Sequence, residues 1–378
     1  MNSMGTLVRF RQKGFSLVEV VVGLGIAMIS MLVVTQVFAV FEGEKRTTTS
    51  GADAQNNGAI ALFMIEQDAR MAGWGMDTSL YSGCTNSFSY CDGSAACGGA
   101  VGPLPEMNFA SLTLKDGGGG ADTISAHYFA NPTETAFSLP MTTTIQKTMP
   151  SSSSELDVER VNGCEKSDML LVSQAGNCTL MQVTHVQGEK GGEAKRFQHN
   201  PGAGGPFNPP ASYQKDHGWP AYTTGAKVAC FKAPPMGALF HHSYSINPVT
   251  RQLIRTSPER AEPIASDIMD LQIQYGIADA GGSQVVNDWV DAAGDTWANP
   301  NFTNARRIKA IRIALVARSA QYERPKEGSC RITTEKTIEQ WPSWASFNTA
   351  NYGEDWQCYR YKVFETVVPL RNVLWGNL

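Results

Sequence analysis

The sequence is short of charge and contains none of the common catalytic signatures. Charged residues make up only 17% of the 378-residue chain, and the 31 Lys and Arg are outnumbered by 35 Asp and Glu. Binding to nucleic acid requires clustered positive charge, so this balance argues against a nucleic-acid partner. The sequence has no G-x-S-x-G, no H-E-x-x-H and no Cys/His dyad signature. We therefore expect no enzymatic activity and no cofactor.

Three groups of residues suggest a ligand or metal site, but each lacks the required pattern. The glycine run Asp116–Gly120 is not followed by the Lys and Ser or Thr of a phosphate loop and predicts a flexible turn. The adjacent His241 and His242 would point to opposite faces of a strand, so they cannot hold one metal ion. Four acidic residues cluster loosely near one predicted loop: Asp279, Asp288, Asp291 and Asp295. They offer oxygen ligands to Ca²⁺ without the spacing of an EF-hand, so solvated carboxylates are favoured and no metal is expected.

Cysteine is missing from the first 83 residues. All eight cysteines follow: Cys84, Cys91, Cys97, Cys164, Cys178, Cys230, Cys330 and Cys358. An even number beyond an apolar segment indicates disulfides in an oxidising compartment, while the alternative, a zinc site, lacks C-x-x-C or Cys/His ligand spacing. Separation along the chain favours the pairs Cys164–Cys178 and Cys330–Cys358. The first three cysteines then compete, which leaves one of them for Cys230.

Proline is missing before Pro103, and the long apolar run Phe15–Phe41 is free of helix breakers apart from two glycines. As a helix rising about 1.5 Å per residue, this run is long enough to cross roughly 30 Å of hydrocarbon. Three basic residues precede it, which predicts an inner N-terminus and an outer body. Glu19 lies inside the run, where an unpaired carboxylate is costly, so we expect it to have a partner and a purpose.

The stretch KGFSLVE, Lys13 to Glu19, resembles the type III signal of type IV prepilins. The resemblance implies that residues 1–14 are a leader, that a prepilin peptidase cuts between Gly14 and Phe15, and that the new amine of Phe15 is methylated. It also implies that Glu19 pairs with the N-terminal amine of a neighbouring subunit during assembly. The alternative is a plain single-span membrane anchor.

One helix is predicted from about residue 15 to residue 72. Residues 15–41 form its transmembrane half, and residues 42–75 form an amphipathic outer half. Five apolar residues recur there at three- and four-residue spacing: Ala61, Leu62, Ile65, Ala69 and Ala72. Glu66 and Arg70 form an i, i+4 pair on another face, and Gly73 and Gly75 supply a stop. We expect the apolar stripe to pack on a β-sheet.

Residues 76–378 form a β-rich extracytoplasmic body that contains the disulfides. Apolar and β-branched enrichment predicts strands at 121–130, 168–174, 179–186, 227–231, 239–246, 252–255, 268–277, 308–318 and 359–369. Asn247 to Thr250 forms a hairpin turn. Three polar stretches, 117–120, 151–154 and 188–210, are expected to be exposed loops. A long helix followed by strands is typical of an α+β architecture.

Four further stretches resemble PilW proteins: Asp68–Gly75, Pro263–Gly276, Ile308–Ser319 and Phe364–Asn372. They are similar to the stretch that closes the long helix, to a strand ending in Y-G, to an R-I-x-L strand and to the terminal strand with its Arg-Asn ending. The resemblance implies a pilin-like fold, in which a long transmembrane and amphipathic helix packs on an antiparallel β-rich domain with long loops.

The same resemblance implies a minor pilin of the type IV pilus, which primes pilus assembly and forms part of the tip complex. Its implied partners are other minor pilins, a PilY1-type tip adhesin, the major pilin, the platform proteins of the inner membrane and the prepilin peptidase. The implied location is the inner membrane, with the body in the periplasm, before assembly and the pilus tip afterwards. Two alternatives remain: a type II secretion minor pseudopilin of the J kind, or an extracytoplasmic adhesin or enzyme carrying a pilin leader.

Overall fold

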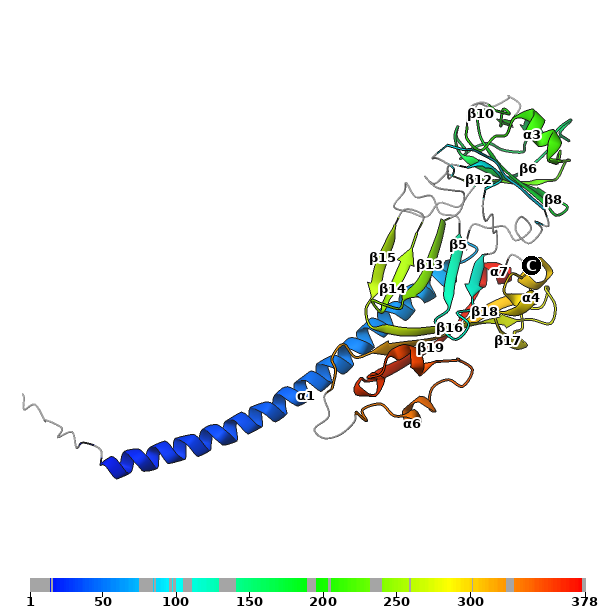
Figure 1. Ribbon diagram of the computed structural model, residues 1–378. Coiled ribbons are helices and arrows are strands. Elements are labelled where there is room, and N and C mark those ends of the chain that lie inside the picture. The colour runs from blue at the N-terminus through cyan, green and yellow to red at the C-terminus, as the bar shows by residue number, and fades with distance from the viewer. Residues whose placement is uncertain are drawn as a thin grey trace, which may run out of the picture. The chain divides into compact units, whose positions relative to one another are not determined.

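The computed structural model divides the chain into two compact units, residues 1–52 and 53–378. The structure describes residues 14, 16–74, 84, 86–94, 97, 100–104, 111–128, 141–188, 195–202, 205–231, 240–257, 260–300, 302–323 and 330–375. Helix α1 (Leu17–Met71) contains 55 residues and begins in the first unit (Figure 1). The predicted helix is therefore confirmed to within two residues at each end.

Two sheets of the second unit lie next to helix α1. The first has the order β15-β14-β13-β5-β4 and the second has the order β17-β16-β18-β19. All their pairings are antiparallel. Their bounds are β4 (Leu112–Lys115), β5 (Thr123–Tyr128), β13 (Phe240–Asn247), β14 (Gln252–Thr256), β15 (Ala261–Ala265), β16 (Ile268–Ile277), β17 (Asp288–Asp291), β18 (Ile308–Arg318) and β19 (Tyr361–Pro369).

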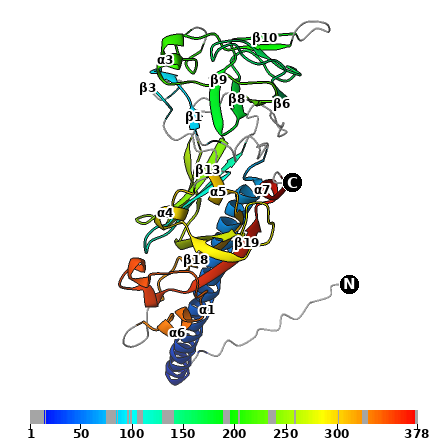
Figure 2. The ribbon, with the colours of Figure 1, turned by 90° about the vertical axis from the view of Figure 1, so that its right-hand side faces the viewer.

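The outer part of α1 packs against these two sheets. Ala61, Ile65, Ala69 and Ala72 are fully buried in one core with residues of β4, β5, β16 and β18, which confirms the predicted apolar stripe. Figure 2 shows the helix passing behind β18 and β19. The helix and the last strand approach closely, because a Cβ atom added at Gly58 would lie only 2.0 Å from the ring of Phe364 in β19. An α+β arrangement with a long helix on antiparallel sheets is thus present as predicted.

The middle of the chain forms further sheets with cores of their own. A five-stranded sheet has the order β1-β9-β8-β12-β6, a three-stranded sheet has the order β10-β11-β7, and β2 pairs with β3. Among the described strands, only β1 and β9 pair in parallel. The bounds are β1 (Asn86–Phe88), β2 (Cys91–Asp92), β3 (Val101–Gly102), β6 (Met141–Thr144), β7 (Leu156–Asp157), β8 (Met169–Gln174), β9 (Asn177–Gln182), β10 (His185–Gln187), β11 (Arg196–Gln198) and β12 (Lys227–Phe231).

The expectation that residues 188–210 form an exposed loop is wrong in part. This stretch contains β11, and Phe197 and Phe207 are buried in the two cores of the middle region. Asn208 is also buried. Its side-chain oxygen accepts from the backbone N–H of Gln182, and its side-chain amide donates to the carbonyl of Gln182. A few well-spaced aromatic residues within a polar stretch are enough to bury it.

Short helices complete the described structure. They are α3 (Ala211–Asp216), α4 (Gly294–Trp297), α5 (Phe302–Ala305), α6 (Glu335–Ile338) and α7 (Arg371–Trp375), with 3₁₀ turns at Thr349–Tyr352 and Trp356–Cys358. The predicted hairpin turn after β13 is present, since the side chain of Asn247 accepts hydrogen bonds from the backbone N–H groups of Val249 and Thr250.

All eight cysteines form disulfides, in the pairs Cys84–Cys178, Cys91–Cys97, Cys164–Cys230 and Cys330–Cys358. The predicted Cys330–Cys358 pair is present, whereas the predicted Cys164–Cys178 pair is wrong. Strand pairing gives the reason: β1 lies alongside β9, with Ser87 opposite Cys178, and so brings Cys84 near Cys178. Cys230 then pairs with Cys164 and not with one of the first three cysteines.

Candidate assembly surface

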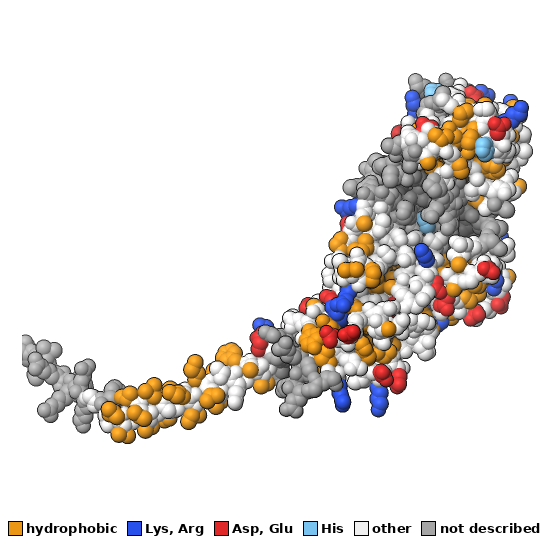
Figure 3. Space-filling view, in the orientation of Figure 1, with side chains coloured by type: hydrophobic (Ala, Val, Ile, Leu, Met, Phe, Trp, Pro, Cys, Tyr) orange, Lys and Arg blue, Asp and Glu red, His pale blue; other side chains and the backbone are white. Residues whose placement is uncertain are grey.

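The inner part of α1 is apolar on every side. The segment Leu17–Glu42 is long and apolar enough to cross a membrane, and each of its 26 residues is exposed. Figure 3 shows hydrophobic side chains covering this stretch of the helix. Its length is about 39 Å at 1.5 Å per residue. A contiguous apolar surface of this size requires a covering of lipid or of other apolar helices.

Glu19 lies in the first turn of α1, where a carboxylate faces the positive end of the helix dipole. One of its oxygens, Oε2, accepts a hydrogen bond of 3.3 Å from the backbone N–H of Ser16. Apart from this bond, the described residues offer the carboxylate no hydrogen-bonding or charged partner. Gly14 is exposed, and Phe15, the predicted site of cleavage and methylation, lies outside the described residues.

At the other end of α1, Asp68 joins the helix to β13. The hydroxyl of Tyr244 donates to Oδ2 of this buried carboxylate, and His242 Nδ1 lies 2.8 Å from the same oxygen. The Nδ1 atom is also 3.0 Å from the hydroxyl oxygen of Tyr128 in β5. One carboxylate on the helix therefore contacts two residues of β13, and His242 in turn lies beside Tyr128 of β5.

The electrostatics of this cluster keep its two tyrosines protonated. Burial raises the pKa of both Tyr128 and Tyr244, and the negative charge of Asp68 raises each pKa further. A tyrosine that retains its proton remains a hydrogen-bond donor. The hydroxyl of Tyr244 therefore continues to donate to Asp68, and this bond attaches the helix to the sheet.

The end of α1 is held by a residue from the far end of the chain. The side-chain amide of Asn372 lies 3.2, 3.4 and 3.1 Å from the carbonyl oxygens of Arg70, Met71 and Ala72. Carbonyls at the end of a helix lack intrahelical partners, and that of Met71 also accepts a 2.8 Å hydrogen bond from the N–H of Trp74. Gly73 follows with a φ of +79°, and its N–H donates to the carbonyl of His127. The predicted stop at Gly73 is thus present.

Residues of the Y-G and R-I-x-L strands have structural roles in the second sheet. The hydroxyl of Tyr275, at the centre of the core, accepts a 2.7 Å hydrogen bond from the backbone N–H of Leu114. Arg312 lies between the rings of Trp289 and Trp344, with its guanidinium carbon 5.0 and 4.4 Å from their centroids. These contacts stabilise the sheet on which α1 packs.

Potential metal ligands do not converge into a usable site among the described residues. Two groups of possible ligands occur, each made of one aspartate and two cysteines, but the cysteines are already joined as disulfides. A disulfide sulfur is not the thiolate that binds a metal. The four acidic residues considered for Ca²⁺ form no such group. Of the adjacent histidines on β13, His242 bonds to Asp68 and is thus committed to the helix contact.

Sequence reasoning missed the partners of the helix end. It placed Asp68 and Asn372 in recognisable stretches but assigned neither a contact. The sequence carries one indirect signal: each is a polar residue next to an apolar, periodic run, where a buried polar group needs a partner.

Two family models match parts of the chain. The family described as Type IV Pilus-assembly protein W, PilW, matches residues 228–372, and the prokaryotic N-terminal methylation motif matches residues 9–35. None of the curated proteins matches the chain. Among solved structures, a type IV-like pilin from Thermus thermophilus is similar with 8% identity and a TM-score of 0.32, covering 84% of this chain and 97% of that one.

Proposed function

Because the chain is a type IV pilus protein of the PilW family, we propose that it is a minor pilin that primes pilus assembly and remains in the tip complex. The observation that supports this proposal is the apolar helix segment Leu17–Glu42, whose residues are all exposed and which carries one carboxylate near its start. A membrane anchor needs only the apolar surface. A subunit that packs helix against helix also needs a group that sets the register, and Glu19 is suited to this role.

The energetics of Glu19 favour an intermolecular partner. An unpaired carboxylate in the membrane costs roughly 2.5–3.5 kcal/mol at mid-depth. An opposite charge at about 4 Å, in an effective dielectric constant of about 20, returns on the order of 4 kcal/mol. The amine released by cleavage between Gly14 and Phe15 is a suitable positive charge when it comes from a neighbouring subunit. Pairing with that amine offsets the cost only after assembly, so it favours the assembled state.

The size of the body supports a terminal position in the filament. Packed helices lie 8–10 Å apart, whereas a compact body of 326 residues, the length of the unit 53–378, has a radius of gyration of about 20 Å. In a fibre made only of such subunits, the size of the bodies and not the packing of the helices would set the spacing between neighbouring subunits. A few copies at the end of a fibre of smaller subunits meet no such limit.

In this proposal the chain acts by assembly and not by catalysis. It is inserted in the inner membrane with its body in the periplasm, where eight cysteines can oxidise. The prepilin peptidase removes residues 1–14 and methylates Phe15. The processed subunit then packs with other minor pilins, a PilY1-type tip adhesin and the first major pilins, in contact with the platform proteins of the membrane.

The test is a comparison of Glu19→Ala with Glu42→Ala in cells that lack the native chain. Glu42 lies at the outer end of the same apolar segment, so its replacement is a matched control. We expect both variants to be inserted and cleaved at Phe15, as read by mass spectrometry of the mature N-terminus. Only Glu19→Ala should lose surface pili and co-purification with other minor pilins.

Three results would overturn the proposal. A mature chain that begins at Met1 would refute processing, and normal pili with Glu19→Ala would refute the role of the carboxylate. If cells without the chain keep their pili but lose protein secretion, the chain is a type II secretion pseudopilin instead.

A further inference from the structure

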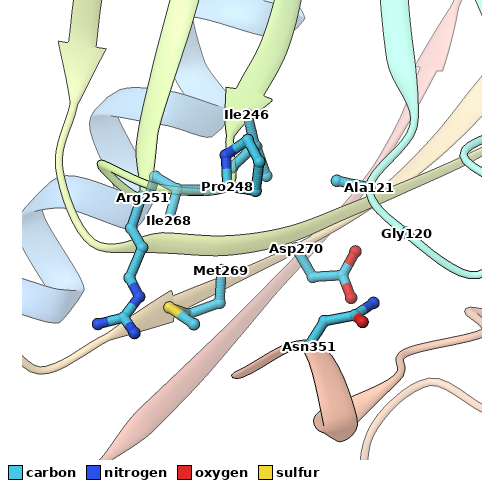
Figure 4. Close-up of a pocket in the computed structure, with 9 residues that line it drawn as sticks. All are labelled: Gly120, Ala121, Ile246, Pro248, Arg251, Ile268, Met269, Asp270 and Asn351. Atoms are coloured by element: carbon cyan, nitrogen blue, oxygen red, sulfur yellow. The ribbon is translucent and has the colours of Figure 1, made fainter. Parts of the chain in front are cut away.

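A pocket of about 380 Å³ opens in the second unit, beside the hairpin turn between β13 and β14. Its wall includes Ile246, Pro248 and Met269, which are apolar, and Arg251, Asp270 and Asn351, which are polar. Figure 4 shows Arg251 at one end and Asp270 with Asn351 at the other, with Met269 between them. The volume lies within the range of roughly 300–1,000 Å³ that is usual for small-ligand sites.

Arg251 is the polar group of this wall that has unused hydrogen-bonding capacity. Among the described residues, its guanidinium has no hydrogen-bonding or ion-pair partner, although Nη2 lies beside Gly353, 3.8 Å from where a Cβ atom would be. A guanidinium carries five N–H donors in a planar fork that matches a carboxylate. The charge is therefore available to a ligand.

The backbone of Arg251 is fixed in a conformation that most residues avoid. Its φ is +54°, in the left-handed region, where glycine or asparagine is usual. Its N–H donates to the carbonyl of Asn247 at 2.8 Å, and its own carbonyl accepts from the N–H of Ile268 at 3.0 Å. These backbone bonds fix the point on the pocket wall at which the Arg251 side chain begins.

Asp270 forms no ion pair with Arg251, although the structure describes both side chains, and its carboxylate bonds to neutral donors. Oδ1 accepts from the N–H of Leu271 and from the side chain of Gln272, and Oδ2 accepts from the hydroxyl of Tyr352. Burial raises the pKa of the Asp270 carboxyl above its usual range. As far as the chain is described, the pocket has one unpaired cationic end, an apolar middle and a hydrogen-bonding far end.

We propose that this pocket binds a carboxylate carried on a short apolar stem, with the carboxylate against Arg251 and the stem against Pro248 and Met269. A free N-acylated or organic acid has this chemistry, and so does the C-terminus of a neighbouring polypeptide that ends in an apolar residue. The inference does not depend on the proposed role in the pilus, because it uses only residues of the second unit and needs no filament.

The test uses the full chain in detergent and four probes: N-acetyl-leucine, N-acetyl-leucinamide, and a six-residue peptide ending in leucine with either a free or an amidated C-terminus. Binding is measured by isothermal titration and by saturation-transfer NMR at low salt. Small acids of this size should bind with a dissociation constant on the order of 1 mM. The two amides should bind at least about tenfold more weakly, because the bidentate bond to the guanidinium is lost.

Arg251→Gly is the decisive variant, because glycine suits a φ of +54° and the protein should keep or gain stability. We expect it to weaken binding of both acids by about tenfold or more, with an unchanged or higher melting temperature. Arg251→Lys keeps the charge without the planar fork and should give intermediate binding. Arg331→Gln, which alters an exposed arginine elsewhere, should bind as the native chain does.

The outcomes separate the sources of the carboxylate. Tighter binding of the free-ended peptide than of N-acetyl-leucine assigns the pocket to a neighbouring chain's C-terminus, and equal or weaker binding assigns it to a free acid. The proposal fails if neither acid binds the native chain by about 20 mM, twenty times the expected dissociation constant. It also fails if the amides bind as well as the acids, or if Arg251→Gly binds the two acids as tightly as the native chain does.

Discussion

Asn372 caps the end of α1, and this contact predicts the order of stability of two variants at that position. The side-chain amide of Asn372 lies against three terminal carbonyls of the helix, those of Arg70, Met71 and Ala72. Asn372→Ala removes the amide donor from all three carbonyls, of which that of Met71 keeps its bond from the N–H of Trp74. Asn372→Asp keeps the shape but places a negative oxygen against carbonyl oxygens at the negative end of the helix dipole. The aspartate variant should therefore be the less stable of the two.

The magnitude follows from two N–H donors. Each net hydrogen bond is worth about 0.5–1.5 kcal/mol, so Asn372→Ala should lower the free energy of unfolding by about 1–3 kcal/mol. Asn372→Asp should add about 0.3–1 kcal/mol from the dipole. With an unfolding entropy of about 2.1 cal/mol/K per residue over the 326-residue unit, the alanine variant should melt about 2–4 °C lower.

The measurement is thermal unfolding of the full chain in detergent, together with hydrogen exchange of the last turns of α1. Arg371→Ala, which removes an exposed side chain next to Asn372, is the control and should melt with the native chain. Exchange should quicken in residues 66–74 for both Asn372 variants. If Asn372→Asp is as stable as the native chain, or more stable than Asn372→Ala, the capping argument is wrong.

Three other perturbations have expected outcomes. Gly58→Ala forces a methyl group into the ring from β19 and should lower the unfolding free energy by about 1–2 kcal/mol, whereas Gly51→Ala, with open space around it, should be neutral or stabilising. Replacing both Cys330 and Cys358 by serine opens a loop with a sequence separation of 28 and should cost about 3–4 kcal/mol in denaturant unfolding. Burial lowers the pKa of His199, so the stability that its neutral form gives is complete above pH 6.5 and is lost as the pH falls below that value. His199→Asn should therefore make the unfolding free energy less dependent on pH between pH 7 and pH 5, by up to about 1.4 kcal/mol per pH unit.

The helix and the central strands could be predicted because their patterns are local. Ala61, Ile65 and Ala69 repeat with the period of a helix, and the structure buries all three. The segment Ile268–Ile277 becomes β16 with the predicted bounds, and its pairing with β18 buries the alternate apolar residues on α1. In each case the residues that determine the element lie within a few positions of one another.

The contacts that join distant parts of the chain could not be predicted in the same way. Cys178 pairs with Cys84 because β1 aligns with β9, a pairing between segments about 90 residues apart that leaves no mark in either segment alone. Separation along the chain pointed instead to Cys164, the nearer cysteine. Loop-closure entropy grows only slowly with loop length, so proximity in sequence is a weak guide once strand pairing contributes.

The residues that contact α1 are separate from the cores of the middle region. This separation suggests that the middle region can change in sequence while the attachment of the helix is kept. His242, Tyr244, Phe364 and Asn372 all contact α1, and all lie in the stretch that matches the PilW family. The residues from 141 to 227 precede that stretch and bury their apolar side chains in cores that contain no residue of α1. Substitutions in those cores should therefore alter the stability of the middle region and leave the helix attachment intact, because neither the cap nor the carboxylate of Asp68 depends on them.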